Sequence, residues 1–191
     1  GLGDVYKRQH PNRMMVHNGE INTITGNVDK MLSRESILRS EYINDRFKDI
    51  VPILDVTGSD SARLDNTLEF MNMAGVDLPL AVMTLIPEPW QHTEMMSREK
   101  RAFYQYYATM MEPWDGPASI IFSDGDLLGA VLDRNGLRPS RYYITNDKNG
   151  DKYLILSSEV GALDIPVETI IKKERLHPVS YTHLTLPTKL E

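Results

Sequence analysis

The chain has 191 residues, of which 41% are hydrophobic and 25% charged, and its formal net charge is -6. This composition is typical of a globular domain, and it argues against a basic nucleic-acid-binding surface and against an apolar segment long enough to span a membrane. The lack of cysteine excludes disulfides, thiolate metal sites and a cysteine nucleophile within these residues.

The two ends of the chain differ in character from the rest. Residues 1–9 lack the apolar segment of a signal peptide, and residues 179–191 form a tail rich in threonine and leucine. We therefore expect both ends to be foreign sequence and the domain itself to comprise residues 10–178.

The first predicted element is a short strand at Met14–His17, followed directly by Asn18 and Gly19. An Asn-Gly pair after an apolar run usually marks a tight hairpin turn. The residues after this pair alternate poorly and soon become polar and helix-like, which weakens the hairpin interpretation. Two alternatives stay open: an irregular turn, or a pair whose N–H groups serve another purpose.

Helical patterns occupy the middle of the chain. Apolar spacing predicts helices over residues 28–38 and 42–49, followed by an apolar run that a proline interrupts. A clearer helix comes next, with Ser59 or Asp60 as its N-cap and Gly75 just after its end.

Two more helices are predicted before the pattern changes. Residues 77–87 have one proline in the first turn and another after the end of the helix. Residues 97–113 form the second of these helices, which a proline stops. We interpret its aromatic face as core rather than as a cofactor-binding surface. That face comprises Phe103, Tyr106, Tyr107 and Met110.

The last part of the chain is typical of strands. Residues 118–136 predict a strand, a turn at SDGD and a second strand. Residues 141–159 predict another hairpin, and residues 167–173 a final strand. A mixed front, a helical middle and two hairpins indicate an α+β fold with a mainly antiparallel sheet.

Asn18 and Gly19 are the first candidates for chemistry. An oxyanion hole needs hydrogen-bond donors aimed at the point where negative charge develops. The side-chain amide of Asn18 and the backbone N–H of Gly19 can supply two such donors, and glycine permits close approach of a substrate. From spacing alone, a structural turn is the plainer interpretation of this pair.

Acidic and histidine side chains are the next candidates for chemistry. Asp60 at a helix start is usually a cap, but the same position can bind a ligand ammonium if the helix opens onto a pocket. Asp124 and Asp126 are interpreted as turn residues rather than a cation site. The histidines lack metal-ligand spacing, so surface or capping roles are expected for them. They are His10, His17, His92, His177 and His183.

Two further segments are less ordinary. In EPWDGPASI, residues 112–120, Trp114 precedes a rigid turn that leads into a strand. DRNGLRPSRYY, residues 133–143, places arginines around a tight turn. A salt-bridged hairpin is the plainer interpretation, and shaping of a nearby site is the alternative. These arginines are Arg134, Arg138 and Arg141.

Five segments in order carry a family resemblance: HPNRMMVHNGEINTITGNVDKM, GSDSARLDN, KRAFYQYYATMMEPWDGPASIIFSDG, GAVLDRNGLRPSRYYIT and SSEVGALD. Together they closely resemble the glutaminase domain of the glutamate synthase large subunit, over residues 10–178. The HNG motif with a later SD is shared by class II glutamine amidotransferases in general. EPWDGPAS, DRNGLRPSRYY and SSEVG are specific to glutamate synthase.

The resemblance implies an N-terminal-nucleophile hydrolase fold, an αββα sandwich with mainly antiparallel sheets, incomplete at both ends of this chain. It also implies that an N-terminal cysteine attacks the glutamine amide with its own α-amine as base, and that water then hydrolyses the thioester. On this resemblance Asn18 and Gly19 are the catalytic oxyanion donors, and Asp60 binds the α-ammonium of glutamine. No metal ligand is implied.

The complete family enzyme would pass the ammonia to a second site, where 2-oxoglutarate is aminated and reduced to glutamate. That step implies FMN, an iron–sulfur cluster and an electron-donor subunit or protein, none of them held by this fragment. The expected partners are therefore glutamine and the other domains of the large subunit, with neither nucleic acid nor a membrane. The expected location is the cytoplasm, or the plastid of a photosynthetic eukaryote.

The chain departs from the family in lacking the cysteine and an upstream arginine that grips the glutamine α-carboxylate. We therefore expect an internal piece of a glutaminase domain that is inactive as written. The alternatives are the glutaminase domain of another class II amidotransferase and a non-catalytic relative that binds an amino acid or a partner. A further alternative is a partial domain that does not fold stably because its sheet edges are exposed.

Overall fold

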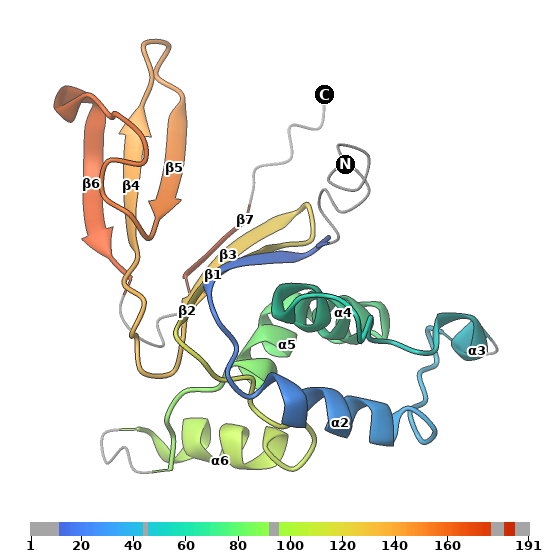
Figure 1. Cartoon of the computed structure of the whole chain (residues 1–191). Coiled ribbons are helices and arrows are strands. Elements are labelled where there is room, and N and C mark those ends of the chain that lie inside the picture. Colours follow the sequence, from blue (N-terminus) through green and yellow to red (C-terminus); the bar gives the residue numbers. More distant parts are fainter. Residues whose placement is uncertain (1–11, 44–45, 92–95, 177–181, 186–191) are drawn as a thin grey trace.

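The computed structural model describes residues 12–43, 46–91, 96–176 and 182–185, which form two antiparallel sheets and a group of helices (Figure 1). The strand order is β1-β2-β3-β7 in the larger sheet and β5-β4-β6 in the smaller one. Helices cover one face of the larger sheet, and the smaller sheet lies on the side of its other face. The α+β class with antiparallel sheets is thus confirmed.

The larger sheet is built around the first predicted hairpin. β2 (Ala118–Ser123) and β3 (Leu127–Leu132) pair as expected. The side chain of Asp124 accepts the N–H groups of Asp126 and Leu127, which confirms the SDGD turn. β1 (Met15–Gly19) pairs with the edge of β2 that faces away from β3.

A fourth strand of this sheet, β7 (Thr182–Thr185), pairs its backbone with β3. It lies within residues 179–191, the tail that the sequence suggests to be foreign. The origin of that tail and of residues 1–9 stays a prediction.

The smaller sheet contains the second predicted hairpin, β4 (Arg141–Asn146) and β5 (Lys152–Ser157). A short 3-10 helix, η2 (Val167–Thr169), leads into β6 (Ile170–Arg175), which pairs with the other side of β4. The final strand, predicted over residues 167–173, is therefore confirmed from residue 170 onward, whereas its first three residues form the 3-10 helix.

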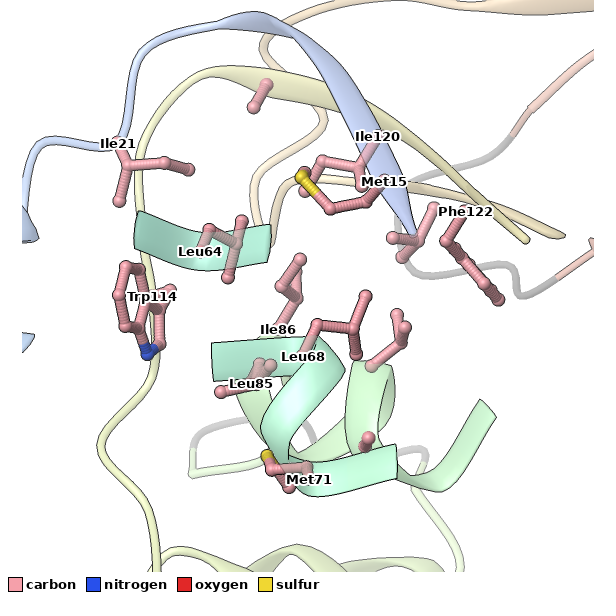
Figure 2. Close-up of a cluster of buried hydrophobic side chains, with 14 of the residues drawn as sticks. Met15, Ile21, Leu64, Leu68, Met71, Leu85, Ile86, Trp114, Ile120 and Phe122 are labelled. Atoms are coloured by element: carbon pink, nitrogen blue, oxygen red, sulfur yellow. The ribbon is translucent and has the colours of Figure 1, made fainter. Parts of the chain in front are cut away.

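Alternation along β2 and β3 sends side chains to both layers. Ile120 and Phe122 point into the main core, whereas Ile121 and Ala130 belong to a smaller cluster with residues of the second sheet. Figure 2 shows the main core between the sheet and the helices. Its buried members include Met15, Leu64, Leu68, Leu85 and Trp114.

Among the described residues, five α-helices precede β2. They are α2 (Ile24–Arg34), α3 (Phe47–Ile50), α4 (Asp60–Met73), α5 (Leu78–Leu85) and α6 (Arg98–Tyr107). The helix expected over 28–38 begins earlier because Ile24 also packs against the core. The helix expected over 42–49 is a single turn, although residues 44–45 lie outside the described residues.

The predicted ends of α4 and α5 are confirmed. Ser59 is the N-cap of α4, since its hydroxyl accepts the N–H of Ala62. Gly75 follows the helix with φ +94°, a conformation that glycine adopts at little cost. In α5 a proline occupies the first turn, where no N–H is needed.

The face predicted for the aromatic helix is wrong in part. Tyr104, which was not placed on that face, is 1% exposed, whereas Tyr106 is 57% exposed. The phenol of Tyr104 donates a hydrogen bond to buried Glu88, which directs this side of α6 inward. The helix also ends at Tyr107 and does not continue to Pro113.

Candidate functional site

β1 is an edge strand within the described part of the chain, and its pairing with β2 decides where its N–H groups point. Ser123 donates its N–H to the carbonyl of Met14 at 2.8 Å, and Glu20 donates to that of Pro117 at 3.3 Å, so the even-numbered residues bond to β2. In an antiparallel pair these residues alternate with residues whose N–H points the other way. Gly19 is one of the latter, and its N–H faces out from the free edge.

Gly19 is also a point of close backbone approach. A Cβ at this position would lie 1.9 Å from the carbonyl oxygen of Pro117, and φ is +146°. Only glycine fits without a shift of the chain. Asn18 and Gly19 therefore end a strand, and the interpretation of the pair as a turn is wrong.

The side chain of Asn18 lies on the opposite face of β1 from its neighbour His17, as alternation requires. Its amide nitrogen Nδ2 donates a hydrogen bond to Oγ of Ser158 at 2.8 Å. An amide nitrogen carries two hydrogens, so this bond leaves the second for a ligand. Ser158 comes directly after β5, so a residue of the smaller sheet's loop contacts the end of β1.

Asp60 is the first residue of α4, but it is not the cap. Ser59 performs that role, and the carboxylate of Asp60 turns toward β1, where Oδ2 accepts the N–H of Ile21 at 3.0 Å. Oδ1 accepts the N–H of Ser61 at 2.7 Å. Burial acts to raise the pKa of Asp60, but these two hydrogen bonds and the charge of His17 together lower it below its ordinary value. The side chain is 25% exposed, so an ionised carboxylate is accessible to a ligand.

His17 is a site residue that sequence reasoning missed. Its side chain is 2% exposed, and Nε2 lies 2.8 Å from Oγ of Ser61 and 3.4 Å from Oδ2 of Asp60. Burial lowers the pKa of His17, although the nearby Asp60 acts in the opposite direction. The expected surface or capping role is therefore wrong for this histidine. His17 and Met15 are two positions apart in β1, so their side chains lie on the same side of the strand, facing the core. This spacing was the signal in the sequence that could have revealed a buried histidine.

The roles expected for the other four histidines stay predictions. Three of them lie outside the described residues, and the side chain of the fourth, in β7, is likewise not described. These are His10, His92, His177 and His183. Among the described residues no group of His, Cys, Asp and Glu side chains could hold a metal ion.

Asp65 is the second residue that the sequence did not reveal. It is fully buried, and its carboxylate accepts the N–H groups of Arg13 at 2.7 Å and of Met14 and Met15 at 2.8 Å. Asp60 and Asp65 thus bind the chain on either side of Gly19 from a single helix. Their position within SDSARLDN gave a clue to the helix but none to this long-range contact.

The less ordinary segments converge near the end of β1. The carbonyl of Asp115 accepts the N–H of Asn22 at 2.8 Å, and its carboxylate pairs with Arg134 at 3.4 Å. Arg138 pairs with Glu159 at 3.8 Å. Arg134 and Arg138 thus link the loop after β3 to the EPWDG and SSEV segments, rather than forming salt bridges within one hairpin.

The site therefore offers two N–H donors at the end of β1, and the ionised carboxylate of Asp60 binds the chain two residues farther along, at Ile21. Donors of this kind can stabilise a developing oxyanion, and the carboxylate can bind a cation.

Within the described ranges, no helix is long and apolar enough to cross a membrane.

Comparison with known proteins adds independent information. The model of the family described as class II glutamine amidotransferases matches residues 4–188. Over 173 residues, or 91% of this chain, the NADPH glutamate synthase large chain of Bacillus subtilis is 52% identical. An NADH glutamate synthase of Schizosaccharomyces pombe is 48% identical over 174 residues, 91% of this chain.

A third relative is the chloroplastic ferredoxin-dependent glutamate synthase 2 of Arabidopsis thaliana, 46% identical over 171 residues and 88% of this chain. The matched regions amount to 11%, 8% and 10% of the three relatives, so the chain spans only about a tenth of their length.

Proposed function

The chain belongs to the class II glutamine amidotransferases, and from this premise we propose that it is part of the glutaminase domain of a glutamate synthase. The single observation that supports the proposal is that one short segment carries the Asn18 amide, the outward N–H of Gly19 and, at Ile21, the N–H that the carboxylate of Asp60 accepts. The names of the relatives, all glutamate synthases, support the choice of this enzyme within the family.

In the proposed reaction, Asp60 binds the α-ammonium of glutamine and so places the side-chain amide at the end of β1. Attack of a thiolate on that amide carbon makes the carbonyl oxygen an anion. The Asn18 and Gly19 N–H groups then stabilise this oxygen, and each such donor contributes roughly 3 kcal/mol to lowering the barrier. Collapse of the adduct breaks the C–N bond and releases ammonia, and water hydrolyses the thioester to glutamate.

The nucleophile of this reaction is not in these residues, because the chain has no cysteine. We propose that another segment of the full-length protein supplies the thiol and its base. The chain as printed then hydrolyses no glutamine, although it retains the residues that surround the reacting carbonyl.

The same proposal covers the larger architecture. The described α, β and β layers would be completed to an αββα sandwich, with residues 10–178 belonging to the domain. An iron–sulfur cluster is held by cysteine thiolates, which these residues lack, so the cluster belongs to another domain. We propose that FMN and the site of an electron-donor partner lie outside this segment as well. We assign the enzyme to the cytoplasm or, as the name of one relative suggests, a plastid.

The direct test is to express the full-length protein that contains this segment and to measure glutamine hydrolysis. We expect ammonia release that is abolished when the N-terminal cysteine upstream of residue 10 is changed to serine. A full-length protein without such a cysteine, or an intact one that binds glutamine without hydrolysing it, would instead support a non-catalytic relative.

A further inference from the structure

The contact between Asn18 and Ser158 joins two segments that are far apart in the sequence. The Nδ2–Oγ distance is 2.8 Å, and the residues are 140 positions apart. Since the Asn18 side chain lies at the sheet surface, packing alone does not determine the plane of its amide. The hydrogen bond to Ser158 does so: Oγ accepts from the nitrogen end of the amide, and the bond holds that end toward Ser158.

Ser158 is itself held from both sides. The carbonyl of the preceding Ser157 accepts a hydrogen bond from the hydroxyl of Ser140 at 3.2 Å, and the following Glu159 pairs with Arg138 at 3.8 Å. The loop that carries Arg138 is in turn fixed by buried Asp133, whose carboxylate accepts the N–H of Arg138 at 3.3 Å. The loop after β3 therefore contacts both neighbours of Ser158 and supports its position beside the end of β1.

We propose that Ser158 is a positioning residue, which holds the Asn18 amide so that its free hydrogen points at the developing oxyanion. This inference rests on the proposed function, and it explains why the DRNGLRPSR and SSEV segments lie beside the HNG motif. Ser158 needs no contact with glutamine in this role. Its removal affects the transition state, where the oxyanion forms, more than the binding of substrate.

The test uses the full-length enzyme with the Ser158→Ala, Ser158→Thr and Ser33→Ala substitutions. Ser33 is a matched control because its hydroxyl also makes a 2.8 Å hydrogen bond, to the carbonyl of Lys30 within α2. We expect Ser158→Ala to lower kcat for glutamine hydrolysis by about 3- to 10-fold with KM nearly unchanged, the effect of one neutral hydrogen bond. Ser158→Thr, which keeps the hydroxyl, should restore most of kcat, and Ser33→Ala should match the wild type.

A double-mutant cycle shows whether Ser158 acts through Asn18. In an Asn18→Ala background, Ser158→Ala should have no further effect on kcat, because the amide that it positions is gone and no new partner for the hydroxyl replaces it. Additive losses would overturn the proposal, as would a Ser158→Ala enzyme with the kcat of Ser33→Ala or one altered only in KM. A wild-type enzyme that hydrolyses no glutamine would reject the proposed function. In that case, an Asn18 side-chain NMR resonance that Ser158→Ala does not shift would reject the contact as well.

Discussion

The carboxylate of Asp60 accepts the backbone N–H of Ile21 at 3.0 Å, and this bond joins the first residue of α4 to the segment directly after β1. Five residues along the same helix, Asp65 binds the start of β1. The proposed ammonium site and the proposed oxyanion donors are therefore parts of one connected unit. Some substitutions in this unit should lower stability, and others should affect glutamine binding or hydrolysis.

Asp65 should be required for stability. Asp65→Asn keeps one oxygen, which can still accept the N–H groups of Met14 and Met15, but it places an amide nitrogen against the N–H of Arg13 and removes the charge that strengthens all three bonds. We therefore expect a loss of about 2–3 kcal/mol in the free energy of unfolding. Urea denaturation of the chain measures this. Asp29→Asn, at an exposed position of α2, is the control. Equal stability of the two variants would contradict the assigned role of Asp65.

Two glycines should respond to alanine in opposite directions. Gly19→Ala places a Cβ 1.9 Å from the Pro117 oxygen and should cost about 2–4 kcal/mol of stability. Gly26 lies inside α2 with no atom within 4 Å of a Cβ, so Gly26→Ala should stabilise by about 0.5–1 kcal/mol. Thermal unfolding distinguishes them, and a shift of the same sign in both would count against the described path of β1.

His17 should make stability dependent on pH. Burial lowers the pKa of His17 in the folded protein, whereas in the unfolded chain this histidine has its ordinary pKa of about 6.5. As the pH drops below about 6.5, His17 of the unfolded chain therefore binds a proton before His17 of the folded protein does. Stability should therefore fall as the pH drops from about 6.5 toward the lowered pKa, and remain unaffected by His17 above this window. His17→Gln should remove this part of the slope. Identical slopes for both proteins in urea titrations would exclude buried His17 as the source.

Asp60 should act on substrate binding. Asp60→Asn removes the charge that pairs with the glutamine α-ammonium, and we expect KM for glutamine to rise by about 10- to 100-fold, the range for a charge-assisted hydrogen bond. Steady-state kinetics of the full-length enzyme measure the effect. Asp55→Asn, in the loop before α4, should leave KM unchanged. If both substitutions gave the same KM, Asp60 would not be the ammonium site.

Much of the fold was predictable because local patterns determine it. The two hairpins follow from alternation and turn residues, and Ser59 and Gly75 mark the ends of α4. The face of α6 was not predictable, because the decisive partner of Tyr104 is Glu88 on a separate segment. The spacing of apolar residues predicts which side of a helix is buried, but a single buried polar contact can turn a different side toward the core.

The residues of the site were likewise predictable only in part. Asn18, Gly19 and Asp60 could be proposed from short motifs whose residue types suit oxyanion and ammonium binding. His17 and Ser158 could not, because their roles depend on neighbours 44 and 140 positions away. A sequence shows which side chains can donate or accept, but only the fold shows which of them meet.

The central claim is that Asn18 and Gly19 stabilise an oxyanion during glutamine hydrolysis, and the most direct measurement is kcat of the Asn18→Asp full-length enzyme. This substitution keeps the shape of the side chain and replaces a donor by an acceptor. We predict a fall in kcat of about 100- to 1000-fold with little change in KM, whereas Asn146→Asp, at the exposed end of β4, keeps wild-type values. An Asn18→Asp enzyme with the kcat of Asn146→Asp would contradict the account.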